Sequence, residues 1–137
     1  MRYSNLFPKS RKQEFKEDLS VNAKLLIKAG FIDQLMAGSY TLLPLGFKVV
    51  KKIEEIIREE INKTGASELL MPLLHPKSIW NETGRWEKAA EVMYQFKKDG
   101  KEYALSFTHE EIVLDLVRKH SQTYRDYPIK VYHFSTK

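Results

Sequence analysis

The sequence predicts an α+β protein in which an antiparallel sheet is flanked by helices. Apolar residues recur at helical spacing in residues 13–29, 47–63 and 109–120, and short segments between them are predicted as strands. These helices and strands do not alternate regularly along the chain, which argues against a parallel sheet built from βαβ units. The length of 137 residues corresponds to about one domain.

The first half of the chain is expected to hold two helices separated by a short strand. Residues 13–29 form the first helix because their apolar side chains recur every three or four positions. Residues 40–43 form a strand that stops at Pro44. Residues 47–63 form the helix with the clearest apolar face, and Gly65 is placed to cap its C-terminal end.

The second half is expected to be built mainly from short strands. The predicted elements are a strand at 68–71, one helical turn at 76–81, a loop at 82–86, strands at 92–96 and 102–107, a helix at 109–120 and a last strand at 129–135. The pair Asp99-Gly100 lies between two of these strands and is typical of a tight hairpin turn.

The composition limits the classes of function. The 23 Lys and Arg residues exceed the 18 Asp and Glu residues, giving a net charge of +5 that favours polyanionic partners such as nucleic acid or nucleotide phosphate. The N-terminal arm, residues 1–16, is the most basic segment. The absence of cysteine excludes disulfides, cysteine-ligated metals and thiol nucleophiles. No apolar run reaches the roughly 18 residues of a membrane span, so a soluble intracellular protein is expected.

General motifs for catalysis and metal binding are missing from the sequence. It has no Gly-rich phosphate loop, His-Glu-x-x-His, nucleophile elbow or calcium loop. The histidines are scattered along the chain, at positions 75, 109, 120 and 133. His109 and His120 share one helix face but lie about three turns apart, too far to share a metal, so we predict core or edge histidines and no metal site. Trp80 and Trp86 are expected to be packing anchors.

The segment Thr108-His-Glu-Glu111 has two interpretations. Thr108 and Glu111 have the spacing of a capping box, which would satisfy backbone N–H groups at the start of a helix. Alternatively, the junction between a strand and a helix is a common ligand site, and Glu110 would point away from the capping residues. A carboxylate at that place could pair with the ammonium group of a substrate.

Several segments resemble a known family. Gly46 to Pro72 resembles motif 1 of class II aminoacyl-tRNA synthetases, a long helix and a strand ending in proline that form the dimer interface of that class. Four segments around it are similar to bacterial-type prolyl-tRNA synthetases: Ala29-Gly-Phe-Ile32, Gly38 to Gly46, Trp80 to Trp86 and Thr108 to Glu111. The resemblance extends from about residue 12 to the last residue.

The resemblance implies a proline–tRNA ligase, a cytoplasmic homodimer without membrane or DNA partners. Such an enzyme uses ATP and Mg²⁺ to convert proline to prolyl-adenylate and then esterifies the 3′ end of tRNA(Pro). The proline-binding Thr-x-Glu element of the family matches Thr108 and Glu110. The interface of motif 1 corresponds to Phe47, Val50, Ile53, Ile57 and Pro72, and a possible active-site loop contains Arg85 and Trp86.

The chain also departs from the family pattern. Phe107 stands where the family usually has proline, and the sequence stops at Thr136-Lys137, where the Phe-Arg-x-Glu of motif 2 is expected to follow. The ATP-binding arginines of motifs 2 and 3 are absent, so no catalytic residue is expected in these 137 residues. Residues 1–137 are therefore expected to be the N-terminal part of a class II catalytic domain and to be inactive alone.

Two alternatives remain open at this stage. A threonine-specific synthetase shares the features around Gly84 to Trp86 and Tyr124 to Pro128, but that relative uses a zinc-ligating cysteine and this chain has none. A non-catalytic module could instead bind RNA or a protein partner through its basic arm. A reading frame that continues with Phe-Arg-x-Glu after Lys137 would favour the synthetase, and a natural stop codon there would favour the module.

Overall fold

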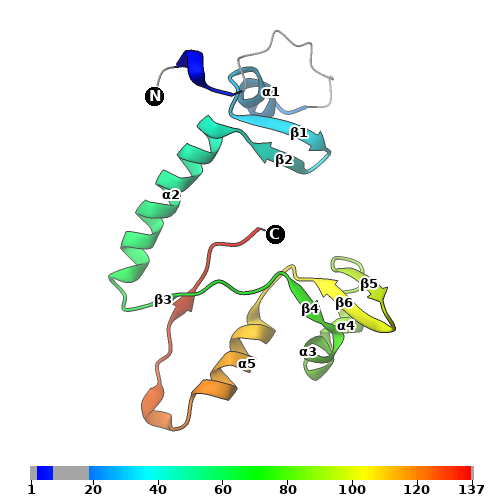
Figure 1. Cartoon of the computed structure of the whole chain (residues 1–137). Helices are drawn as coiled ribbons and strands as arrows, with labels where there is room; N and C mark the ends of the chain where they lie inside the picture. Colours follow the sequence, from blue (N-terminus) through cyan, green and yellow to red (C-terminus); the bar gives the residue numbers. More distant parts are fainter. Residues whose placement is uncertain (1–2, 8–18, 137) are drawn as a thin grey trace. The chain divides into compact units, whose positions relative to one another are not determined.

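The computed structural model describes residues 3–7 and 19–136 and divides the chain into two compact units, Met1–Glu60 and Ile61–Lys137. Both units combine helices with small sheets, which confirms the predicted α+β class (Figure 1). Two predictions lie outside the described residues. They are the basic residues of the N-terminal arm and residues 13–18 of the helix predicted at 13–29.

The first unit contains a helix and a β-hairpin. Helix α1 (Val21–Lys28) begins after Ser20, whose hydroxyl accepts a hydrogen bond from the backbone N–H of Ala23 at 3.2 Å. Strands β1 (Ile32–Met36) and β2 (Ser39–Leu42) pair in antiparallel fashion. The short 3-10 helix η1 (Tyr3–Asn5) precedes them in the chain. Strand β2 was predicted, whereas β1 was not.

Helix α2 (Pro44–Asn62) begins three residues earlier than predicted. Pro44 occupies its first turn, where a missing backbone N–H costs nothing, so this proline starts the helix instead of merely ending a strand. Gly46 is buried within the first unit, and a β-carbon at that position would lie only 2.1 Å from the carbonyl oxygen of Phe31. The close contact between α2 and the backbone of Phe31 therefore requires glycine at position 46.

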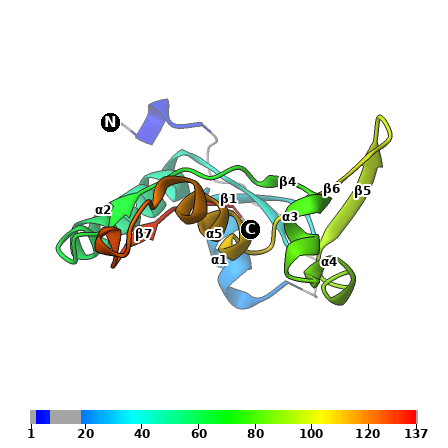
Figure 2. The same ribbon diagram turned by 90° about the horizontal axis from the view of Figure 1, so that it is seen from below.

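The second unit is centred on a three-stranded antiparallel sheet in the order β4-β6-β5. Its strands are β4 (Leu74–Pro76), β5 (Tyr94–Lys98) and β6 (Lys101–Leu105). The hairpin of β5 and β6 extends beyond the neighbouring helices (Figure 2). Asp99 and Gly100 both take positive φ angles at its turn, as their sequence predicts.

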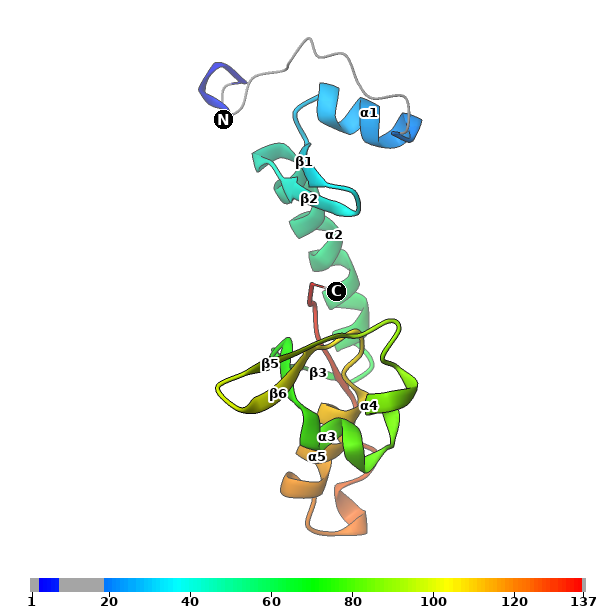
Figure 3. The same ribbon diagram turned by 90° about the vertical axis from the view of Figure 1, so that its right-hand side faces the viewer.

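Helices α3 (Lys77–Glu82) and α4 (Arg85–Lys88) lie together beside this sheet (Figure 3). The core of the unit consists of Trp80, Trp86, Ala89, Met93 and Ala104. Trp80 is completely buried and Trp86 is 5% exposed, which confirms both as packing anchors. The predicted loop at 82–86 is wrong at its end, because Arg85 and Trp86 already belong to α4 after a left-handed Gly84.

The remaining elements follow the sheet. Helix α5 (Glu110–His120) agrees with the predicted helix, and a 3-10 turn, η2 (Tyr124–Asp126), comes after it. Strand β3 (Ser67–Glu68) pairs in parallel with β7 (Val131–Tyr132). Both are much shorter than the strands predicted at 68–71 and 129–135, and their parallel pairing departs from the predicted antiparallel sheet.

Candidate functional site

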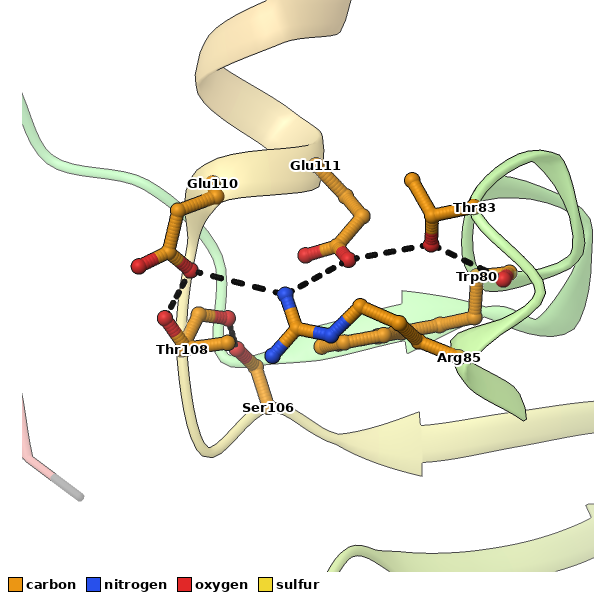
Figure 4. A network of polar contacts seen from close by, with 7 residues as sticks. All are labelled: Trp80, Thr83, Arg85, Ser106, Thr108, Glu110 and Glu111. Carbon is orange, nitrogen blue, oxygen red and sulfur yellow. Dashed lines mark hydrogen bonds and ion pairs between the residues drawn. The ribbon is translucent and has the colours of Figure 1, made fainter. Parts of the chain in front are cut away.

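The N-terminus of α5 does not form the predicted capping box. The helix begins at Glu110 after His109, whose Nε2 lies 3.1 Å from the carbonyl oxygen of Pro72 instead of capping the helix. Thr108 donates its hydroxyl hydrogen bond to the carboxylate of Glu110, and Glu111 is turned toward another element (Figure 4). The two residues expected to form a reciprocal box are thus bound to different partners.

Glu111 is held by Thr83, which follows α3, and by Arg85, the first residue of α4. Arg85 Nη1 donates to Glu111 Oε1 at 2.8 Å, and the Thr83 hydroxyl lies 3.2 Å from the same oxygen and 3.2 Å from the carbonyl oxygen of Trp80, so that its one hydrogen is shared between them (Figure 4). The Glu111 side chain is only 2% exposed, compared with 33% for Arg85. Arg85 supplies a cation beside this deeply buried carboxyl group.

Arg85 is also fixed by aromatic side chains. Its guanidinium carbon lies 5.5 Å from the ring centre of Trp80 and 5.1 Å from that of Phe107. Cation–π contacts of this kind are worth about 0.5–1 kcal/mol at exposed sites and more when water is excluded. Phe107, which departs from the family pattern, therefore helps to hold the Arg85 guanidinium in position.

Glu110 lies next to this pair but has a different environment. Its carboxylate is 3.8 Å from Arg85 Nη1 and its side chain is 68% exposed. Ser106 donates a hydrogen bond to the carbonyl oxygen of Thr108, which holds the turn just before Glu110 (Figure 4). Thr108 and Glu110 thus form a fixed polar pair that faces outward.

A cavity of about 430 Å³ opens beside this polar pair. Its walls come from the segments around residues 71, 108–114 and 131–133 and are mostly apolar. The lining residues are Met71, Thr108, His109, Glu110, Val113, Leu114, Val131, Tyr132 and His133. Glu110 is the one acidic residue among these lining residues. A small molecule with an apolar body and one cationic group therefore matches the lining.

Three of the histidines that are scattered in the sequence come together in space. The rings of His75 and His109 are 5.2 Å apart, and those of His109 and His133 are 4.3 Å apart. His75 and His109 are buried, as core histidines should be, whereas His120 is exposed at the end of α5. Within residues 3–7 and 19–136, no group of three His, Cys, Asp or Glu residues is arranged to hold a metal ion.

The residues predicted for a dimer interface lie largely at the surface. Phe47, Ile53 and Ile57 of α2 are 51%, 50% and 41% exposed, Val50 is half-buried, and Pro72 is exposed. Because the structure contains a single chain, the interface itself stays a prediction. In the described part of the chain, no helix is long and apolar enough to cross a membrane.

Comparison with known proteins places this geometry in context. No protein-family model matches the chain. Curated proteins named proline–tRNA ligase match all of it, with 46% identity in Halothermothrix orenii, 47% in Aquifex aeolicus and 41% in Syntrophus aciditrophicus. The chain is similar to proline–tRNA ligases over its whole length. It spans 24% of the length of each of these proline–tRNA ligases.

A solved structure supports the fold. A crystal structure described as the RNA-binding domain of threonyl-tRNA synthetase from Cryptosporidium parvum Iowa II superposes with a TM-score of 0.71. The match covers 77% of this chain and 27% of that one, at 22% sequence identity. At this identity the likeness concerns the fold alone, whereas the similarity to proline–tRNA ligases agrees with the family resemblance found in the sequence.

Sequence patterns alone missed the pairing of Arg85 with Glu111. Arg85 was predicted to lie in a possible active-site loop, and the structure brings its guanidinium within 4 Å of both carboxylates at the start of α5. The two partners are 26 positions apart in the chain, and their opposite charges were the only available signal. Trp86, the other member of the predicted loop, is a core residue.

Proposed function

We propose that the natural protein containing this chain is a proline–tRNA ligase. It would activate proline with ATP to prolyl-adenylate and transfer the prolyl group to the 3′ end of tRNA(Pro). The observation that carries this proposal is the outward-facing Thr108–Glu110 pair at a mostly apolar cavity, in a chain that is 40–47% identical to proteins of that name.

The chemistry of proline fits the cavity. Free proline carries a secondary ammonium group at neutral pH, and its ring is apolar. The carboxylate of Glu110 would accept a charge-assisted hydrogen bond from this ammonium group, worth about 1.5–3 kcal/mol. The bond from Thr108 holds that carboxylate in place, and apolar side chains such as Met71 and Val113 would contact the ring.

The wider features of the enzyme belong to the same proposal. Activation would use ATP and Mg²⁺, and we assign no residue of the described part to either. The exposed apolar side chains of α2 would form a homodimer interface. We further propose that the enzyme works in the cytoplasm. The threonine-specific alternative is disfavoured because the chain has no cysteine to bind zinc.

Amino-acid-dependent pyrophosphate exchange by the natural protein tests the proposal. Proline should support exchange and threonine should not. Glu110→Ala should lower kcat/KM for proline by a factor that corresponds to a loss of about 2–3 kcal/mol in transition-state stabilisation. The KM for ATP should change little. Glu110→Gln keeps the shape and removes the charge, so it should also be impaired.

Replacement of the exposed Glu91 by alanine provides the matched control, because it removes a carboxylate that is not among the residues lining the cavity. This variant should exchange at the unmodified rate. Threonine-dependent exchange by the unmodified protein would favour the alternative synthetase, and a Glu110→Ala enzyme with full proline activity would remove Glu110 from the site.

A further inference from the structure

Arg85 is a potential competitor for the carboxylate that binds substrate. The same nitrogen atom, Nη1, lies 2.8 Å from Glu111 Oε1 and 3.8 Å from Glu110 Oε2. The first distance is a hydrogen bond and the second is only an ion-pair contact. A small displacement of the guanidinium would reverse this preference and place Arg85 in hydrogen-bond contact with Glu110.

Glu111 is the group that opposes this displacement. It lies in the interior, is not among the residues lining the cavity, and receives hydrogen bonds from both Arg85 and Thr83. Arg85 brings one cationic group to a place where two carboxyl groups lie within 4 Å of the same nitrogen atom. Because Arg85 balances the buried Glu111, the exposed Glu110 is the carboxylate whose charge a cationic substrate would neutralise.

We propose that Glu111 and Arg85 form a positioning pair for the amino-acid site, in which Glu111 keeps the Arg85 guanidinium away from Glu110. This inference rests on the proposed function, because it assigns the role of Glu110 to binding an amino group. It adds two residues that act on the site without touching the substrate. Glu110 binds the ammonium group, Glu111 holds the competing cation, and Trp80 and Phe107 limit the movement of that cation.

A merely structural pair would behave differently. If the Arg85–Glu111 bond served only stability, removal of either partner would loosen the fold, and removal of both would not restore substrate binding. If Glu111 restrains a competitor, removal of Glu111 should weaken amino-acid binding. Removing Arg85 as well should then restore it, because no cation is left to capture Glu110.

The test measures proline-dependent pyrophosphate exchange in the natural protein with three variants. Glu111→Gln should raise the KM for proline about tenfold while the KM for ATP stays within about twofold. The double variant Glu111→Gln with Arg85→Gln should return the KM for proline to within about threefold of the unmodified protein. Glu111→Asp keeps the charge on a shorter side chain, and should cause a smaller rise.

Glu82→Gln is the matched control, because Glu82 also pairs with an arginine, Arg118, at 2.7 Å but lies outside the cavity lining. Its KM for proline should be unchanged. An unchanged KM in the folded Glu111→Gln and Glu111→Asp proteins would overturn the inference, and so would a double variant as impaired as Glu111→Gln. If Glu111→Gln does not fold, the Glu111→Asp and double variants decide.

The same measurements separate this inference from the proposed function. If the unmodified protein activates an amino acid other than proline, the proposed function is wrong. The positioning pair can still be tested with that amino acid, because every amino acid carries an ammonium group that Glu110 could bind. If the unmodified protein activates proline and Glu111→Gln leaves its KM unchanged, the positioning pair is wrong and the proposed function stands.

Discussion

Replacement of Glu111 by alanine is expected to destabilise the second unit far more than replacement of Glu110. Glu111 is 2% exposed and accepts two hydrogen bonds, whereas Glu110 is 68% exposed. Breaking a buried ion pair costs about 3–5 kcal/mol because the remaining charge stays unpaired. Since Arg85 is 33% exposed and partly hydrated, we expect about 2–3 kcal/mol for Glu111→Ala, and less than about 0.5 kcal/mol for Glu110→Ala.

Urea unfolding followed by tryptophan fluorescence measures this difference directly. Both tryptophans lie in the core of the second unit, and the Arg85 guanidinium lies over the ring of Trp80. Thr108→Ala adds a further comparison, because a capping box would make it cost about 1 kcal/mol. In the structure Thr108 bonds to the exposed Glu110, so its loss should cost less than about 0.5 kcal/mol. Equal losses for Glu110→Ala and Glu111→Ala would refute this reasoning.

Three further predictions concern other parts of the chain. Gly46→Ala should destabilise the first unit by about 2 kcal/mol or more in urea unfolding followed by circular dichroism, because its β-carbon would lie 2.1 Å from the carbonyl oxygen of Phe31; an unchanged midpoint would contradict this. Ile53→Lys should weaken the self-association that we propose for the apolar face of α2, measured by sedimentation over a range of concentrations, and an unmodified protein that is monomeric throughout would count against it. The backbone N–H groups of Thr123 and then Gln122 hold the pKa of Asp126 below its ordinary value of 3.8. The stabilising contribution of this carboxylate is therefore complete above that value and is lost as the pH falls through the lowered pKa. Asp126→Asn should therefore reduce the acid dependence of unfolding, and an unchanged pH profile would show that this carboxylate does not contribute.

Local patterns were sufficient for part of the fold. The apolar periodicity of α2 and the Asp99-Gly100 turn depend on neighbouring residues, and both were found. Strand β1, Ile-Asp-Gln-Leu-Met, was missed because its residues give no clear alternation of apolar and polar types. The short strands β3 and β7 were predicted too long, because their extent depends on parallel pairing between segments that are far apart in the chain.

The candidate site shows the same division. Thr108 and Glu110 were singled out by a family resemblance, and their hydrogen bond is a contact between residues two positions apart. The capping box was also a local inference, but it failed because Arg85 and Thr83 bind Glu111 from another part of the chain. A long-range ion pair overrides a local cap when it satisfies a buried charge, and spacing alone cannot reveal this.

The carbonyl oxygen of Pro72 accepts hydrogen bonds from two imidazole rings, at 2.9 Å from His75 Nε2 and 3.1 Å from His109 Nε2. Since a carbonyl oxygen can only accept, both rings must carry a proton on Nε2. The acceptor belongs to the backbone, so it would survive a change of side chain at position 72 that left the main chain in place. The three positions should therefore differ in their tolerance to substitution. Positions 75 and 109 need a donor with the reach of histidine, whereas the side chain at position 72 can vary without the loss of either hydrogen bond.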